Sequence, residues 1–283
     1  MTISFTRFWT RIAICSAFAS TLLLSGCLET VPESTELPEM PKNTDYTTLA
    51  TTTDPVTTTT TTTTTAVIPD AMVLKNVPFQ TQNGMLPTGC ELVSALMMLQ
   101  YHDVNVDIDA VVANTNSVYP EKIERNVYAP HPTKAFIGSP DDPTSFGCYP
   151  PVITDMMSNL LPDSLEAVET TGTDLKELAE TYLPQGLPVL VWATIDMQET
   201  YEAIGWYLLD ENNQPTDEWF YWKAREHCLL LIGYNENYYF FHDPLADAAP
   251  TPYDRALVEE RFASLGKMSA VVRPAQKITN TES

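Results

Sequence analysis

An unbroken run of threonines, Thr57 to Thr65, separates two parts of this chain that differ in their capacity to fold. From Leu28 to about residue 70 the sequence is rich in Thr, Pro and Glu and has few aliphatic side chains. Such a segment buries too little apolar surface to offset the entropy cost of ordering. We therefore expect residues 28–70 to be a disordered linker, with or without O-glycosylation. Of the 283 residues, 71–275 then form one folded domain and 276–283 a tail.

The first 27 residues have the pattern of an export signal. Arg7 and Arg11 supply positive charge, residues 12–24 are mainly apolar, and Leu24-Ser25-Gly26-Cys27 closes the segment. This tetrapeptide resembles a bacterial lipobox, in which Cys27 receives diacylglycerol and becomes the mature N-terminus. We expect a lipid anchor at Cys27 and a domain on the extracellular face of the bacterial cell membrane. An uncleaved anchor and an ordinary signal cut elsewhere are the alternatives.

The charge and the cysteines exclude several classes of function. With 37 acidic and 15 basic residues, the net charge of −22 argues against nucleic acid and anionic lipid headgroups as partners. No two cysteines have the close spacing of a zinc site, and we expect no cofactor and no required metal. Cys148 and Cys228 either form a disulfide or are two buried thiols; the spacing does not decide between them.

Cys90 is the most informative residue of the folded part. It follows Pro87-Thr88-Gly89 and starts a helix whose apolar side chains form one broad face. Backbone N–H groups and the helix dipole at such an end favour a thiolate, which is the reactive form of cysteine. A small buried core side chain is the plain alternative. The partners of Cys90 decide between these interpretations.

The remaining pattern predicts an α+β domain, with helices first and an antiparallel sheet after them. The turn 235–237 predicts a hairpin between its flanking strands, and the Pro- and Gly-rich stretch 117–150 predicts a long loop. The predicted helices start at Cys90, Asp107, Pro151, Thr173 and Leu257. The first predicted strand is short, begins in the segment 73–82 and is halted by Pro78; the others are 188–195, 219–222, 227–234, 238–242 and 268–272.

Three polar residues complete a set that suits thiol-based hydrolysis, which needs a base for the thiol, a group that orients the base and donors for the oxyanion. His227 begins an apolar strand, and Asp243 follows the next strand, where a hairpin would bring it beside His227. Gln82 lies upstream of Cys90, and its amide is a candidate oxyanion donor. Gln80 competes with Gln82 because alternation along a strand places both on one face.

Several segments together resemble the stand-alone relatives of the papain-like peptidases that cleave double-glycine leaders on bacteriocin transporters. The likeness covers about residues 72–273. By this resemblance Cys90 is the nucleophile, His227 the general base and acid, Asp243 the residue that orients His227, and Gln82 the oxyanion donor. The segments are Val77-Pro78-Phe79-Gln80-Thr81-Gln82, Pro87-Thr88-Gly89-Cys90-Glu91, Phe146-Gly147-Cys148-Tyr149, Val191-Trp192-Ala193, Glu226-His227-Cys228, Gly233-Tyr234 and His242-Asp243-Pro244-Leu245.

One departure from that family concerns the thiol itself. The transporter peptidases usually have glycine after the cysteine, whereas this chain has Glu91, whose negative charge raises the pKa of a neighbouring thiol. The sequence predicts a cell-surface cysteine peptidase that cleaves a peptide or isopeptide bond through a thioester. A cell-wall peptide amidase or endopeptidase and an inactive surface binding module of the same fold are the alternatives.

Overall fold

The computed structural model describes residues 68–276 of the chain. The export signal, Cys27 and nearly all of the linker lie outside the described residues. Within the described part, no helix combines the length and the apolar character that crossing a membrane requires.

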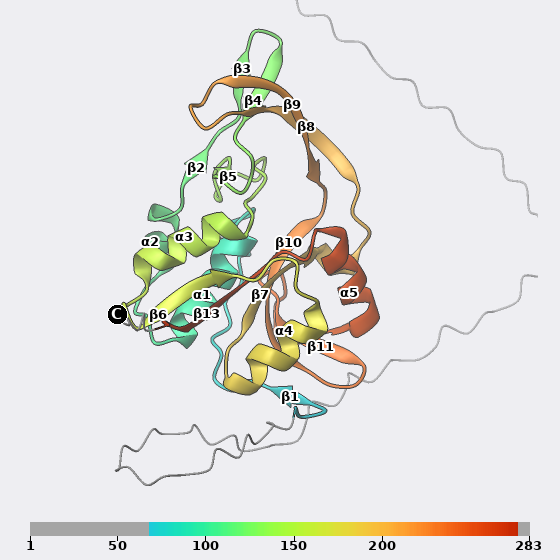
Figure 1. Cartoon of the computed structure of the whole chain (residues 1–283). Helices are drawn as coiled ribbons and strands as arrows, with labels where there is room; N and C mark the ends of the chain where they lie inside the picture. Colours follow the sequence, from blue (N-terminus) through green and yellow to red (C-terminus); the bar gives the residue numbers. More distant parts are fainter. Residues whose placement is uncertain (1–67, 277–283) are drawn as a thin grey trace, which may run out of the picture. The chain divides into compact units, whose positions relative to one another are not determined.

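The core of the domain is a large antiparallel sheet with the strand order β12-β11-β10-β7-β13-β6, to which β1 adds beside β10 (Figure 1). The central strand β10 is buried along its whole length and pairs with both β7 and β11. The strands of this sheet are β1 (Met72–Val73), β6 (Leu165–Glu169), β7 (Val189–Thr194), β10 (Glu226–Tyr234), β11 (Tyr238–His242), β12 (Thr251–Asp254) and β13 (Ser269–Pro274).

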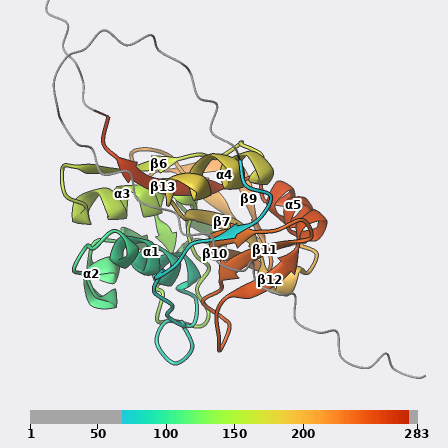
Figure 2. The same cartoon turned by 90° about the horizontal axis from the view of Figure 1, so that it is seen from below.

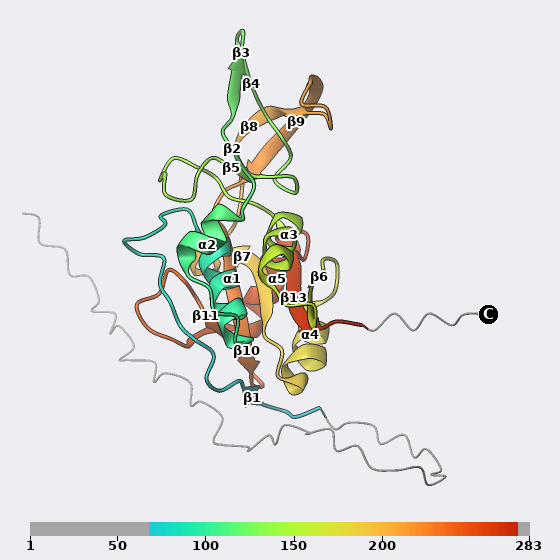
Figure 3. The ribbon, with the colours of Figure 1, turned by 90° about the vertical axis from the view of Figure 1, so that its left-hand side faces the viewer.

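Helices cover both faces of this sheet (Figures 2 and 3). Side-chain alternation along β10 sends Cys228 and Leu230 into the core beneath α1 and α3, while Leu229 and Leu231 enter a second core beneath α4 and α5. Packing on both faces explains why β7 and β10 are nearly continuous apolar runs. The helices are α1 (Cys90–Tyr101), α2 (Ile108–Ala113), α3 (Pro150–Leu160), α4 (Leu175–Tyr182) and α5 (Arg255–Ser264).

The start of α1 is determined by the turn before it. Gly89 is the residue before the helix, and Gly89 N–H donates to the Leu86 carbonyl at 3.0 Å. From Cys90 to Leu99 every side chain of α1 is buried, because α1 packs across β10 and against α3. The predicted central helix is confirmed, and its burial extends to the two polar side chains Glu91 and Ser94.

The predicted helices and the hairpin are confirmed, with small shifts in their bounds. Asp107 caps α2, and its side chain accepts from Ala110 N–H at 2.9 Å. Antiparallel pairing of β10 with β11 confirms the predicted hairpin. The predicted short strand before Pro78 is only partly correct: β1 ends at Val73, and the chain then runs between α1 and the residues after β11.

The predicted loop 117–150 is only partly correct, because it contains four short strands. Of these, β3 (Glu121–Ile123) and β4 (Asn126–Ala129) join β8 (Glu202–Leu209) and β9 (Pro215–Lys223) in a second sheet, drawn at the top of Figure 1. The pair β2 (Ser117–Val118) and β5 (Phe136–Ile137) is separate. Trp206 and Trp222 are buried under this second sheet, whereas Trp219 is 42 % exposed.

Candidate active site

Cys90 lies in the first turn of α1, where two groups contact its sulfur. The Cys228 backbone N–H donates to Cys90 Sγ at 3.4 Å, and the thiol donates to Glu91 Oε2 at 3.2 Å. The side chain is 7 % exposed. Burial raises the pKa of Cys90 well above its usual value, and the charges of Glu91 and Glu226 raise it further.

His227 and Asp243 form a buried pair at one end of the hairpin. His227 is the second residue of β10, Asp243 follows β11, and His227 Nε2 lies 2.7 Å from Asp243 Oδ1. Asp243 also accepts from the Leu245 N–H at 2.9 Å and from the Tyr253 hydroxyl at 2.8 Å. Burial opposes ionisation of Asp243, but its interactions with His227 and these two hydrogen bonds lower its pKa overall. The pair orients the imidazole.

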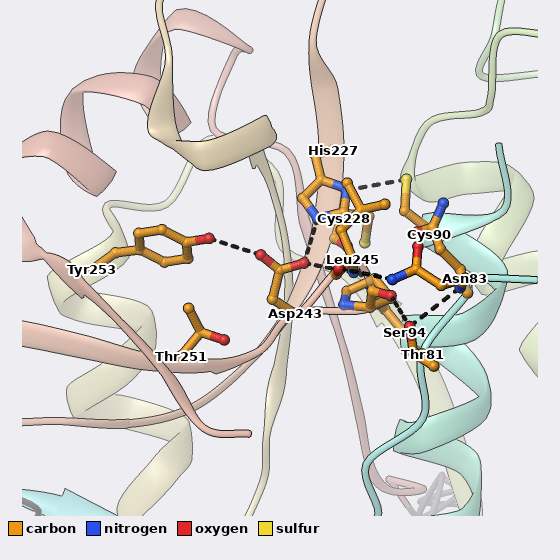
Figure 4. Close-up of polar contacts among 12 residues, drawn as sticks. Thr81, Asn83, Cys90, Ser94, His227, Cys228, Asp243, Leu245, Thr251 and Tyr253 are labelled. Atoms are coloured by element: carbon orange, nitrogen blue, oxygen red, sulfur yellow. Dashed lines mark hydrogen bonds and ion pairs between the residues drawn. The ribbon is translucent and has the colours of Figure 1, made fainter. Parts of the chain in front are cut away.

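The His227 ring and the Cys90 sulfur are neighbours without being hydrogen-bonded. Because Nε2 faces Asp243, Nδ1 is the ring nitrogen left for the thiol. Among the described residues no hydrogen bond joins Cys90 Sγ to His227; the sulfur instead accepts the N–H of the next residue, Cys228 (Figure 4). Catalytic hydrogen bonds are often long in the absence of substrate and shorten when it binds. The thiol proton of Cys90 is instead directed to Glu91 Oε2.

Gln82 supports the turn that leads to Cys90. Its side-chain Nε2 donates to the Leu86 carbonyl at 3.3 Å and to the Pro87 carbonyl at 3.1 Å, and its backbone N–H donates to the Pro244 carbonyl at 2.8 Å. Both amide protons are thus in use, so donation to an oxyanion requires one of these bonds to open. The oxyanion role of Gln82 stays a prediction.

Gln80, the competitor of Gln82, is directed elsewhere. Its Nε2 donates to Gln100 Oε1 at 2.7 Å, near the far end of α1. Because this segment is not a strand, the alternation that placed the two glutamines on one face does not apply.

A pair of buried carboxyl groups adjoins the thiol. Glu91 is fully buried, and its Oε1 accepts from the Cys148 N–H at 2.7 Å. Glu226 is 8 % exposed, and its Oε1 has no hydrogen-bond partner. Burial raises the pKa of Glu91 to about 7, and burial together with the charge of Glu91 raises the pKa of Glu226 well above its usual value. Sequence reasoning identified Glu91 and missed Glu226.

The other candidates in the sequence have structural partners. All three described cysteines are free thiols, so Cys148 and Cys228 are not joined by a disulfide. His242 Nδ1 donates to the Pro78 carbonyl at 2.8 Å, and His131 Nδ1 lies 2.9 Å from the Thr133 hydroxyl. Both histidines thus have structural partners.

The helix-on-sheet fold with a cysteine at the start of its central helix is that of a papain-like cysteine peptidase. Residues 74–270 match the Peptidase_C39 like family, and the chain belongs to that family. A crystal structure described as a C39-like peptidase from Bacillus anthracis is similar, with a TM-score of 0.63 and 25% identity over 74% of this chain and 100% of that chain.

A second solved structure has a lower similarity. It is a double glycine motif protease from an AMS/PCAT transporter in complex with the leader peptide, with a TM-score of 0.41 and 14% identity over 72% of this chain and 95% of that chain. No curated protein matches this chain.

Proposed function

We propose that this cysteine peptidase hydrolyses a peptide or isopeptide bond through a thioester on Cys90, with His227 as base and acid and Asp243 as the residue that orients it. The observation that supports this proposal is the buried hydrogen bond between His227 Nε2 and Asp243 Oδ1, formed beside the backbone N–H that contacts the Cys90 sulfur. A thiol, an oriented imidazole and a helix start are the parts that nucleophilic acyl transfer requires.

The proposed reaction has two acyl-transfer steps. In the first, the thiol proton passes to His227 Nδ1, the sulfur attacks the carbonyl carbon, and the amine leaves with the proton from His227. In the second, water attacks the thioester, His227 takes a proton from the water, and the carboxylic acid leaves as the thiol is restored. The Cys90 backbone N–H, which has no partner within its helix, and Gln82 are the proposed oxyanion donors.

The buried carboxyl groups determine when the thiol ionises. Burial opposes a free thiolate at Cys90, and so do the charges of Glu91 and Glu226 when these groups are ionised. Ionisation of Cys90 therefore depends on transfer of its proton to His227 at the moment of attack. Asp243, with its lowered pKa, remains available as a carboxylate for that imidazolium.

The test is hydrolysis of a mixed peptide library, followed by mass spectrometry. We expect cleavage by the wild-type domain and none by Cys90→Ala. Cys228→Ala is the matched control, because it removes a second buried thiol from the same region and leaves the Cys228 backbone N–H in place. Cleavage that persists in Cys90→Ala would rule out the proposed nucleophile.

The same assay separates the alternative functions. Release of fragments from purified peptidoglycan, with no cleavage of the library, would favour a cell-wall amidase or endopeptidase. If neither substrate is cleaved while circular dichroism shows a folded domain, the binding module is favoured instead.

We further propose that the domain is exported and held at the outer face of the bacterial cell membrane through a lipid on Cys27. The support is the lipobox-like Leu24-Ser25-Gly26-Cys27 and the linker that follows it. Expression in a bacterial host with an alkyne-tagged fatty acid tests this. Wild-type chain should be labelled and Cys27→Ala should not; equal labelling would reject the anchor.

A further inference from the structure

Cys90, Glu91 and Glu226 form a buried cluster. The proposed peptidase reaction uses the thiol of Cys90 but assigns no chemical step to the two carboxyl groups. One ligand-type atom from each residue, the thiol sulfur and two carboxylate oxygens, lies within 4.8 Å of the other two. Glu226 Oε1 is buried and has no hydrogen-bond partner, although leaving a buried polar atom unpaired is costly. We propose that this cluster binds one divalent transition-metal ion, for which Zn²⁺ is the natural probe, and that the ion reversibly blocks Cys90.

The donor set fits such an ion. Zinc takes thiolate sulfur at about 2.3 Å and carboxylate oxygen at about 2.0–2.2 Å, and three protein ligands leave a fourth position for water. Cys90 Sγ and Glu91 Oε2 are 3.2 Å apart, so both can bind one ion with little movement. Thiolate sulfur also disfavours Mg²⁺ and Ca²⁺, which prefer oxygen ligands alone. The ion would supply the partner that Glu226 Oε1 lacks.

The two carboxyl groups of the cluster are held in place by the surrounding backbone. Glu226 is the first residue of β10, directly before His227, and a Cβ placed on Gly147 would come close to both Glu91 Oε1 and Glu226 Oε2, so the two carboxyl groups flank the same glycine. Glu91 is in turn held by the Cys148 N–H. The two carboxyl groups are thus fixed from different elements, α1 and β10, around the sulfur. Prior positioning lowers the entropy cost of binding the ion.

Binding would inhibit the enzyme and would not assist its reaction. As the metal binds, the thiol proton and any proton on the two carboxyl groups are released to solvent. The sulfur electron pair that would attack a carbonyl carbon is then donated to the metal, which lowers the nucleophilicity of the sulfur and blocks access to it. Loss of the ion restores the thiol. The inference concerns occupancy of the thiol, so it holds or fails independently of whether the chain cleaves peptides.

The experiment measures Zn²⁺ affinity by isothermal titration calorimetry and, in parallel, the rate at which iodoacetamide alkylates Cys90, resolved by mass spectrometry. In wild-type protein we expect one Zn²⁺ site and strong protection of Cys90. Glu226→Gln should weaken affinity at least about tenfold, since a lost ligand costs no less than a lost supporting residue. Glu211→Gln, which alters an exposed carboxylate, should leave the affinity unchanged.

Glu226→Asp separates geometry from charge. It keeps the negative charge but withdraws the oxygen by one methylene, so it should also weaken binding. Glu226→Asp also replaces Glu226→Gln in the affinity measurement if Glu226→Gln fails to fold. As a spectroscopic readout, Co²⁺ should give a sulfur-to-metal charge-transfer band with wild-type protein and not with Cys90→Ala.

Two results would overturn the inference. One is equal Zn²⁺ protection of Cys90 in wild-type protein and both Glu226 variants, which would assign the ion to the thiol and imidazole alone. The other is alkylation of wild-type Cys90 that Zn²⁺ does not slow. Zn²⁺ protection in a protein that cleaves no peptide would leave the metal site standing and reject the proposed function.

Discussion

At Cys90 two local influences on the thiol oppose each other. The helix start and the Cys228 N–H favour a thiolate, whereas burial and the charges of Glu91 and Glu226 favour the protonated thiol. The second influence prevails, and the pKa of Cys90 is raised. The sequence predicted the effect of Glu91, because Glu91 is adjacent to Cys90. Glu226 could not be predicted in the same way, because it is distant in sequence and comes near Cys90 only when β10 folds beside α1.

Glu91→Gln tests the charge effect at the thiol. Removing the negative charge should lower the pKa of Cys90, so the pH profile of Cys90 alkylation should move to lower pH and the rate at neutral pH should rise. We expect a shift of roughly one pH unit, which corresponds to about 1.4 kcal/mol. Glu211→Gln is the control. A profile that stays in place or moves to higher pH would contradict the assignment of Glu91 as a destabilising charge.

Asp243 permits a graded test of imidazole orientation. Asp243→Ala removes the acceptor of the His227 N–H and should lower kcat by about 10²–10⁴-fold. Asp243→Asn keeps an oxygen that can accept that N–H, so its loss should be smaller. Steady-state kinetics on a cleaved peptide measures both. Equal activity in wild-type protein and Asp243→Ala would show that His227 needs no orienting partner.

Among the elements, the segment before α3 fixes the carboxyl group of Glu91 beside the Cys90 thiol. Gly147 has φ +155°, a conformation that side-chain-bearing residues rarely adopt, and a Cβ there would clash with Glu91 Oε1. The next residue, Cys148, donates its N–H to Glu91. This contact gives a physical reason for Phe146-Gly147-Cys148-Tyr149 as one of the segments by which the sequence resembles its family.

Gly147→Ala should therefore destabilise the domain and disturb the site. We expect a loss of about 1–3 kcal/mol in the free energy of unfolding, typical of overpacking. Denaturant unfolding measures it. Gly172→Ala is a matched control, because Gly172 also has positive φ, +94°, but a Cβ there meets no atom within 4 Å. If both variants lose the same stability, backbone strain alone explains the effect and the contact with Glu91 is irrelevant.

How far the elements could be predicted depended on local signals. The Asp107 cap predicted α2, and the turn 235–237 predicted the hairpin that joins His227 to Asp243. The strands β2, β3, β4, β5, β6, β8 and β12 were missed because they are short or half-exposed, and the pairing of most of them depends on partners distant in sequence. The contacts of Gln82 could not be predicted either, since only the folded turn shows that its amide donates to the Leu86 and Pro87 carbonyls.

At the scale of the whole molecule, the net charge of −22 acts on any charged substrate. Raising the ionic strength from about 0.01 M to about 0.15 M shortens the screening length from about 30 Å to about 8 Å. For a cationic peptide, kcat/KM should then fall, by up to about tenfold, as attraction to the protein is screened. A matched neutral peptide should change little. An equal response of both peptides would show that long-range charge does not guide the substrate.

The central claim is that Cys90 is a nucleophile whose proton is taken by His227. The alkylation rates of the individual cysteines test this claim most directly. Iodoacetamide is applied at neutral pH to wild-type protein and to His227→Ala, and mass spectrometry follows Cys90, Cys148 and Cys228 separately. The account predicts that Cys90 reacts fastest in wild-type protein and that His227→Ala slows this reaction while leaving the other two unchanged. A Cys90 that reacts no faster than its buried neighbours, or at the same rate without His227, would contradict it.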